Sequence, residues 1–363
     1  LGVAIVWGIG VGLLRGNDFG NLFLDANGYF YAALILPVWW TTTRVDARKD
    51  IRTRMLRATF LAATTLLALK TLFSVYWFTH AGNIFIGANL IPFYRWVRDT
   101  GIGEITILPG NFARVFFQSH IYNVAAFFVL LSSRGPISRL IFPLLALNTS
   151  VIIVSLSRSF WVGTIAGIII LFVLTRRNLK RGLGALVFTV IFALGLLLTV
   201  SRFPFPRPSP ASFSAAVQSR LEPGDAGQSR WNLLPALSNV ASEHAIVGAG
   251  FGKTITYISN DPRIREVSRS GEYTTSAFEW GWLDIWLKMG ALGIIGFVGL
   301  IISTGWLLYQ RAKGDSLTLG GLATLVALTV IHFFTPYLNH PLGIGLLILL
   351  TYTGLPCQVK PDV

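Results

Sequence analysis

The sequence predicts an all-α membrane protein, a bundle of about ten transmembrane helices with one long polar segment on its outer face. Of the 363 residues, 53% are hydrophobic and 13% are charged. Soluble domains carry about 25% charged residues, so this composition favours an integral membrane protein. The apolar residues also form continuous runs instead of the alternating pattern of a membrane barrel, and continuous runs favour helices.

The apolar runs define the predicted spans in chain order. A hydropathy window of about 19 residues places them at 1–14, 28–40, 58–77, 116–131, 140–155, 160–175, 183–200, 291–309, 317–334 and 342–352. Several are short for a hydrocarbon core of about 30 Å, so the Trp and Tyr residues at their ends must be counted in. The chain starts inside an apolar run without Met, which we interpret as a truncated start.

Basic residues orient the bundle. They cluster at 44–57, 134–139, 176–181 and 311–313, and all of these clusters fall on one side when the spans alternate. By the positive-inside rule this side is the cytoplasm. The same rule accounts for most of the net charge of +14, so we expect no nucleic-acid partner. The single cysteine, Cys357, allows no internal disulfide.

The long polar segment divides the chain into three parts. They are an N-terminal transmembrane bundle (1–201), an exoplasmic loop with amphipathic helices (202–279) and C-terminal transmembrane helices (280–363). The loop is basic, but long loops escape the positive-inside rule, so it is either a solvated loop or an anion site. Within it, Trp231, Leu234 and Leu237 recur at helical spacing and predict a helix at the membrane surface, with Arg230 at its start and Pro235 in its first turn.

Three basic side chains are candidates for an anion site. Arg158, in SLSRSFWVG, lies between two apolar runs, where a guanidinium needs a partner or an anionic ligand. The alternative is an arginine that snorkels to the interface. Lys70, in LLALKTLF, has the same alternatives, together with a carboxylate partner on another helix. The Arg230 guanidinium either donates bidentate hydrogen bonds to a phosphate or is a solvated helix cap.

Glu279 is the candidate general base. It lies between Phe278 and Trp280 where the chain returns to the membrane, so we expect a poorly solvated carboxyl group that suits proton abstraction. Asp284 and Lys288 follow at helical i,i+4 spacing, and we expect an ordinary surface pair.

Other motifs exclude several kinds of site. GAGFGKT at 248–254 is not a nucleotide-binding P-loop, because Val247 stands where that motif needs Gly. The five histidines have no metal-ligand spacing, so we predict no metal and no cofactor. The sequence contains no G-x-S-x-G, the commonest signature of serine hydrolases.

Four motifs follow one another in a distinctive order. SRSFWVG at 157–163 begins an apolar run, SRWNLLPAL at 229–237 and EHAIVGAGFG at 243–252 lie in the polar loop, and WLKMGALGIIGF at 286–297 returns to the membrane. In this order the sequence resembles the O-antigen ligase and O-antigen polymerase superfamily over residues 135–296, and RGN at 15–17 extends the resemblance toward the N-terminus.

The resemblance implies a metal-independent glycosyltransferase of the bacterial inner membrane, with its active face toward the periplasm or cell exterior. Such enzymes take a glycan from an undecaprenyl-diphosphate carrier and join it to another glycan or to lipid A core, in polysaccharide or lipopolysaccharide biosynthesis for the cell envelope. The resemblance assigns Arg158 and Arg230 to the diphosphate and places His244 in the turn beside it. Where the family has its histidine, this chain has Glu279, and Trp280 replaces the following Asn.

We therefore predict a polymerase ahead of a ligase, with Glu279, Arg230 and Arg158 as catalytic residues. Trp231 and Trp282 are predicted to stack on sugars, although aromatic belts at membrane interfaces explain them equally well. The expected partners are the diphosphate-linked donor, a glycan or lipid-linked acceptor, the bilayer and proteins of a polysaccharide assembly system. The alternatives are an O-antigen ligase proper, a non-enzymatic transporter of lipid-linked glycans, and a scaffold subunit of the cell envelope.

Overall fold

The computed structural model describes residues 1–43, 49–80, 84–133, 140–175, 179–208, 212–221 and 225–355. Most of these residues are helical, and the chain divides into two compact units. Unit 1 consists of Leu1–Val45, Pro223–Gln310 and Leu328–Val363, and unit 2 of Asp46–Glu222 and Arg311–Ala327. Parts of two predicted basic clusters, 44–48 of the cluster 44–57 and 176–178 of the cluster 176–181, lie outside the described residues, as do the whole cluster at 134–139 and Cys357.

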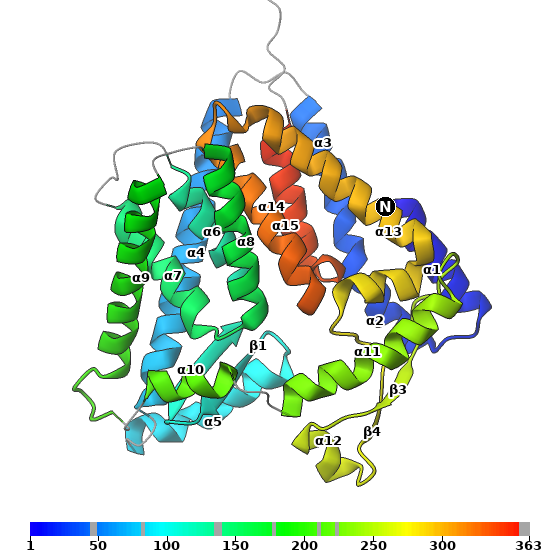
Figure 1. Ribbon diagram of the computed structural model, residues 1–363, viewed down its shortest axis with the longest axis horizontal. Helices are drawn as coiled ribbons and strands as arrows, with labels where there is room; N and C mark the ends of the chain where they lie inside the picture. The colour runs from blue at the N-terminus through cyan, green and yellow to red at the C-terminus, as the bar shows by residue number, and fades with distance from the viewer. Residues whose placement is uncertain are drawn as a thin grey trace, which may run out of the picture. The chain divides into compact units, whose positions relative to one another are not determined.

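Unit 2 is a group of helices with a β-hairpin at one end. Figure 1 shows α4 and α6 to α9 side by side, with α5 and α10 lying across their lower ends. Its elements are α4 (Lys49–Thr79), α5 (Ile84–Asp99), β1 (Gly103–Leu108), β2 (Phe112–Phe117), α6 (His120–Leu131), α7 (Ile141–Val154), α8 (Arg158–Thr175), α9 (Leu179–Ser201), α10 (Phe213–Leu221) and the first part of α14 (Ser316–Phe334).

Buried amides tie the helices of unit 2 together. The Asn123 Nδ2 group of α6 donates to Asn148 Oδ1 of α7 at 2.9 Å and to the Thr64 carbonyl of α4 at 2.9 Å. Asn123 and Asn148 are both fully buried. In an apolar environment such bonds add specificity to helix packing, because an unpaired amide there is costly.

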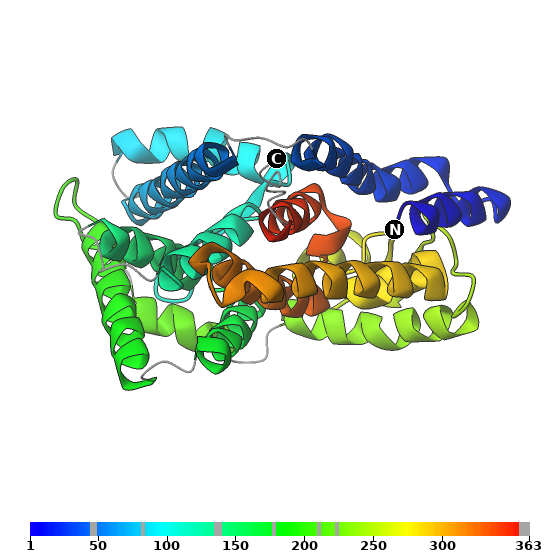
Figure 2. The same cartoon turned by 90° about the horizontal axis from the view of Figure 1, so that it is seen from above.

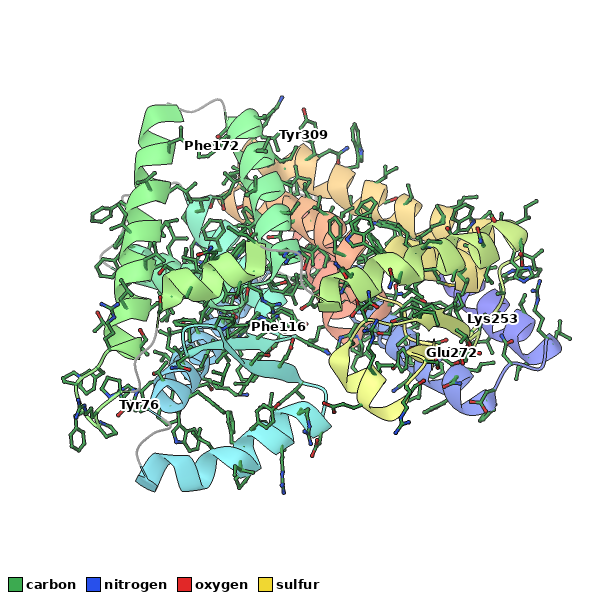
Figure 3. All side chains as sticks on the ribbon, turned by 60° about the horizontal axis from the view of Figure 1, so that its bottom comes forward. Tyr76, Phe116, Phe172, Lys253, Glu272 and Tyr309 are labelled. Atoms are coloured by element: carbon green, nitrogen blue, oxygen red, sulfur yellow. The ribbon has the colours of Figure 1, made fainter. Side chains whose placement is uncertain are left out.

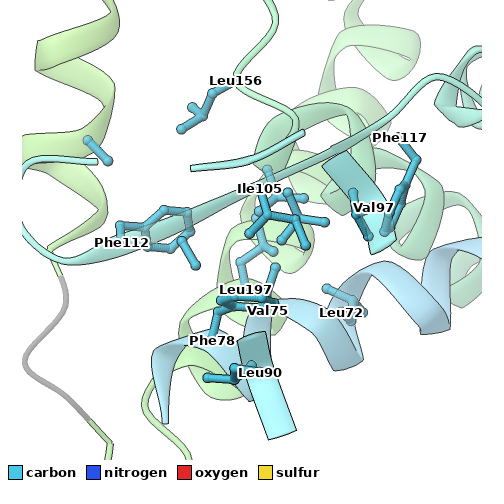
Figure 4. Close-up of a cluster of buried hydrophobic side chains, with 14 residues drawn as sticks. Leu72, Val75, Phe78, Leu90, Val97, Ile105, Phe112, Phe117, Leu156 and Leu197 are labelled. Atoms are coloured by element: carbon cyan, nitrogen blue, oxygen red, sulfur yellow. The ribbon is translucent and has the colours of Figure 1, made fainter. Parts of the chain in front are cut away.

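The β1–β2 hairpin closes the hydrophobic core of unit 2. Its strands are antiparallel, with Ile105 opposite Val115. The close-up in Figure 4 shows Phe112 and Phe117 of the hairpin among Val75 and other buried side chains of the helices. Because β2 is buried on nearly its whole length, its one charged residue is held rigidly.

Unit 1 contains both ends of the chain and a second hairpin. Its elements are α1 (Gly2–Leu14), α2 (Phe19–Phe30), η1 (Tyr31–Leu34), α3 (Ile35–Thr43), α11 (Asp225–Glu243), β3 (Ile255–Ile258), α12 (Pro262–Val267), β4 (Glu272–Thr275), α13 (Gly281–Ala312), the second part of α14, η2 (Tyr337–Asn339) and α15 (Pro341–Gly354). Figure 2 shows α15 beside the η1–α3 segment, with which it is in contact.

The glycine-rich loop, residues 248–254, packs closely against α13 in unit 1. Gly248 and Gly250 have positive φ angles of 84° and 83°, and Gly290 interrupts α13 with φ 63° and ψ −155°. A Cβ atom on Gly248 would lie 2.7 Å from the Gly290 amide nitrogen. The loop therefore needs glycine both for its backbone conformation and for the close approach to α13.

Several described helices fit a membrane. Thr53–Thr79, Arg158–Thr175, Gly182–Ser201, Gly281–Ala312 and Ser316–Phe334 are long and apolar enough to cross one, and Gly2–Leu14, His120–Leu131, Ile141–Val154 and Pro341–Gly354 are shorter apolar helices. On α9, Val187, Phe188 and Ile191 are each more than half exposed, an arrangement that lipid favours and water does not. These helices indicate a multi-pass membrane protein, while the span count of about ten stays a prediction.

The structure differs from the sequence prediction in three places. The span predicted at 28–40 is divided among α2, η1 and α3, because Pro37 lacks the N–H that would continue an α-helix from α2. The all-α prediction missed both hairpins. The predicted amphipathic helix is α11, but it begins at Asp225, so Pro235 lies inside it. Packing of the buried Leu233 and Leu237 in the cluster that includes Ile255 of β3 offsets the lost hydrogen bond.

Candidate functional site

Arg230 and Glu279 form an ion pair in unit 1. Arg230 lies on α11, and Glu279 lies on the short segment that joins β4 to α13. The contact is between Arg230 Nε and Glu279 Oε2, and the two side chains are 47% and 48% exposed. The sequence predicted a poorly solvated Glu279, whereas its carboxylate is half exposed and already paired. A charge pair that water can reach is able to exchange partners with a charged ligand.

Two tryptophans border this pair. The Trp280 Nε1 group donates to the Arg230 carbonyl at 3.0 Å. The Trp231 and Trp280 ring centroids are 5.2 Å apart, with the rings inclined by 62°. Trp231 is 62% exposed, so one large aromatic face beside the ion pair is open to a ligand.

Tyr257 of β3 faces the same region. It packs with Trp280 against the core of α11. Burial raises the pKa of the Tyr257 phenol above its usual value of 10.0, and the negative charge of Glu279 adds to the rise. The phenol is therefore a neutral hydroxyl group at physiological pH.

Arg158 lies in unit 2, at the first residue of α8. It is exposed, and its Nε group donates to the Arg220 carbonyl of α10 at 2.8 Å. Arg158 and Arg230 thus belong to different units.

Sequence reasoning overlooked Arg114, the charged residue of β2. Arg114 is 6% exposed. Its guanidinium donates from Nε to the Ser155 carbonyl at 2.7 Å and from Nη1 to Glu104 Oε2 at 2.7 Å. It also lies over the ring of Phe116, which Figure 3 labels. Burial alone would raise the pKa of Glu104, but the Arg114 charge and hydrogen bonds hold it below its usual value of 4.5. Arg114 anchors the turn before α8, three residues from Arg158. An arginine inside the apolar run FARVFF was the available signal.

The comparisons with known proteins bear on this arrangement. Residues 143–298 match the family model described as O-antigen ligase. This segment is an O-antigen ligase family domain. The matched range is close to the 135–296 predicted from the motifs, and it includes Arg158, Arg230 and Glu279. No curated protein and no solved structure matches the chain.

The O-antigen ligase domain also contains His244 and Trp282, two predicted substrate-binding residues. The His244 Nε2 atom lies 3.0 Å from Arg15 Nη1, and the guanidinium is the donor in this contact. The Trp282 ring is half-buried and lies 5.1 Å from the ring of His332, nearly perpendicular to it. Packing against His332 is an ordinary structural arrangement, and the sugar-binding roles of both residues stay predictions.

The glycine-rich loop of the domain is not a phosphate cradle. Four of the backbone N–H groups at 248–254 already have partners: Gly248 donates to the His244 carbonyl, Ala249 to Leu287, Phe251 to Gly8, and Gly252 to the Asp25 carboxylate. A P-loop instead points free N–H groups at its ligand. The loop instead packs closely on α13 through Gly248 and Gly290.

Lys70 of α4 was predicted either to bind an anion or to pair with a carboxylate. Its Nζ atom lies over the Phe117 ring at 4.4 Å and over the Trp96 ring at 5.4 Å. In the part of the chain that the structure describes, it forms no ion pair, and aromatic faces hold the ammonium instead.

Asp284 and Lys288 form the expected pair, with Lys288 Nζ 2.7 Å from Asp284 Oδ1, but the prediction that the pair lies at the surface is wrong. Both residues are 4% exposed. They are buried because α2 and η2 pack over this turn of α13, and helical spacing cannot reveal neighbours from distant segments.

Within the described ranges, no group of three or more His, Cys, Asp or Glu side chains is placed to hold a metal ion.

Proposed function

We propose that the protein is a metal-independent glycosyltransferase that polymerises glycan units from an undecaprenyl-diphosphate carrier at the periplasmic face of the bacterial inner membrane. The O-antigen ligase domain supports membrane glycan processing as the general activity. The basic residues of the exoplasmic loop favour a donor with a charged leaving group, and Glu279 in place of the family histidine favours the polymerase branch.

The ion pair between Arg230 and Glu279 is the observation that carries the proposal. A carboxylate and a guanidinium on separate elements meet beside an open tryptophan face. A guanidinium has five N–H donors and matches the geometry of phosphate oxygens, so one carboxylate does not saturate it. The pair therefore combines an anion-binding group and a base at one place.

The reaction balances without another reactant. The oxygen of an acceptor hydroxyl forms a bond to the anomeric carbon of the donor sugar while the bond from that carbon to the diphosphate oxygen breaks. The electron pair leaves with the carrier diphosphate, and Glu279 takes the hydroxyl proton. Arginine charge stabilises the leaving group as its negative charge grows, more effectively in a partly dehydrated site than in water.

Donor binding prepares the base in this mechanism. In the resting protein Arg230 holds the Glu279 carboxylate. The donor diphosphate competes for the guanidinium, since phosphate accepts bidentate hydrogen bonds and carries more charge than a carboxylate. Exchange of partners leaves Glu279 free to accept a proton.

A defined assay tests the proposal. Purified protein in lipid nanodiscs is incubated with a diphosphate-linked oligosaccharide, and the products are resolved by mass. A ladder of repeat units supports a polymerase, and a single addition that requires a second acceptor identifies a ligase. Absence of any new glycosidic bond, together with movement of the carrier across vesicles, would replace the proposal with a transporter.

A further inference from the structure

A buried charged group underlies the segment that carries Glu279. We propose that Lys288, with Asp25 and Asp284, is a positioning group that holds residues 276–280 and thereby sets the place of the Glu279 carboxylate. The inference rests on the function proposed above for Glu279, and it assigns a role to residues outside the ion pair itself.

Lys288 contacts three oxygen atoms and one aromatic ring. Its Nζ atom lies 2.7 Å from Asp25 Oδ1, 2.7 Å from Asp284 Oδ1 and 3.0 Å from the Ser276 carbonyl oxygen. It also lies 5.1 Å from the centroid of the Phe278 ring. Two of the three residues immediately before Glu279 are therefore held directly by one buried cation.

The two carboxylates are held by other parts of unit 1. Asp25 Oδ2 accepts from the Gly252 amide at 2.8 Å, and Asp284 Oδ2 accepts from Asn339 Nδ2. These donors stabilise the negative charge that one lysine leaves uncompensated. The group thus links α2, the glycine-rich loop, α13 and η2 to the 276–280 segment.

The segment is fastened at its other end as well. The Trp280 ring nitrogen donates to the Arg230 carbonyl, and Gly281 packs on His332 too closely for any side chain. Ser276 Oγ donates to Asn21 Oδ1 at 3.4 Å, a weak contact in comparison with the bond from Lys288. Without the Lys288 contact, the start of the segment would be held by the Thr275–Ala277 hydrogen bonds and the weak Ser276–Asn21 contact, and a base displaced by about 1 Å loses on the order of 10²-fold in rate.

A buried lysine between two aspartates could also serve stability alone, and a double-mutant cycle separates the two roles. We expect Lys288→Met to lower kcat by about 10²-fold with little change in donor KM. In a Glu279→Gln background the same substitution should lower kcat by less than about threefold, because a positioning group has no effect once the base is absent. If the fold-losses in kcat of the two single variants multiply in the double variant, the proposal is overturned.

Amide hydrogen exchange gives a readout that does not depend on chemistry. Lys288→Met should speed exchange in a peptide covering 276–280 by at least about tenfold, as expected for local opening. The matched control is Thr304→Val, a buried polar residue of the same helix that pairs with Thr351 and does not touch this segment. Unchanged exchange at 276–280, or the same increase in the control, would refute the positioning role.

The design distinguishes this inference from the proposed function. If Glu279→Gln retains wild-type turnover, the base assignment fails, and hydrogen exchange still decides whether Lys288 orders the segment. If Lys288→Met does not fold, Asp25→Asn is used in both measurements, because it keeps the shape and the acceptor for Gly252 while weakening the ion pair. Thermal unfolding of each variant in the same nanodiscs measures its folded state.

Discussion

Replacing Glu279 by glutamine separates its two proposed roles. Glutamine keeps the shape of the side chain but neither accepts a proton in the reaction nor pairs with Arg230 as a charge. Loss of a general base lowers turnover by about 10² to 10⁴-fold. The Arg230–Glu279 pair is about half exposed, and pairs of that kind contribute about 0.2–1 kcal/mol. Because the donor no longer has to displace a carboxylate, donor affinity should rise by about 1.4 to 5-fold.

The measurement uses nanodisc-embedded protein and a diphosphate-linked oligosaccharide. Donor Kd is obtained by calorimetry without acceptor, and turnover from single-turnover product formation. Glu272→Gln is the matched control, since it removes the same charge from the exposed start of β4, labelled in Figure 3, without touching the ion pair. It should leave both quantities close to wild type.

Two results would refute the reasoning, each at a different step. Wild-type turnover in Glu279→Gln removes this carboxylate from the mechanism. A donor affinity that falls, while the control is unchanged, contradicts the exchange of partners at Arg230.

Four further predictions follow from the same structure. Arg158→Ala and Arg230→Ala should each abolish transfer while the protein elutes as a folded species in gel filtration; normal product from either variant removes that arginine from the site. Glu104→Gln should cost roughly 1 kcal/mol of unfolding free energy, discounted because the carboxylate is 55% exposed. The folded-state pKa of Glu104 lies below its ordinary value of 4.5. The contribution of Glu104 to the free energy of unfolding should therefore be complete above pH 4.5 and should disappear as the pH falls through the folded-state pKa. Thermal melts of wild type and variant at about pH 7 and about pH 3 would detect this loss. Gly290→Ala should destabilise unit 1 by roughly 1–3 kcal/mol or more, because its backbone angles are accessible mainly to glycine; an unchanged melting temperature would contradict this. EDTA should leave the transfer rate unchanged. A loss of activity in EDTA that an added divalent ion restores would show a metal requirement.

Local patterns in the sequence were sufficient for the helices and for the family. Continuous apolar runs predicted the helices, since a chain in lipid must satisfy its backbone hydrogen bonds internally. The order of four short motifs predicted the O-antigen ligase domain, which the family model then matched. Val247 excluded a P-loop, and the used N–H groups of the glycine-rich loop agree.

The partners of individual charges depended on the tertiary structure. Helical spacing correctly paired Asp284 with Lys288 but placed them at the surface, because burial there comes from Asp25 and Asn339, which are distant in sequence. The hairpin that carries Arg114 went unpredicted, since the last two residues of its second strand, Phe116 and Phe117, belong to the apolar run predicted as the span 116–131. Spacing along a chain determines which neighbours share a face, whereas contact between Arg230 and Glu279 requires two separate segments to fold onto each other. The sequence alone thus specified which residues carry charge in the loop, and packing decided which of those charges meet.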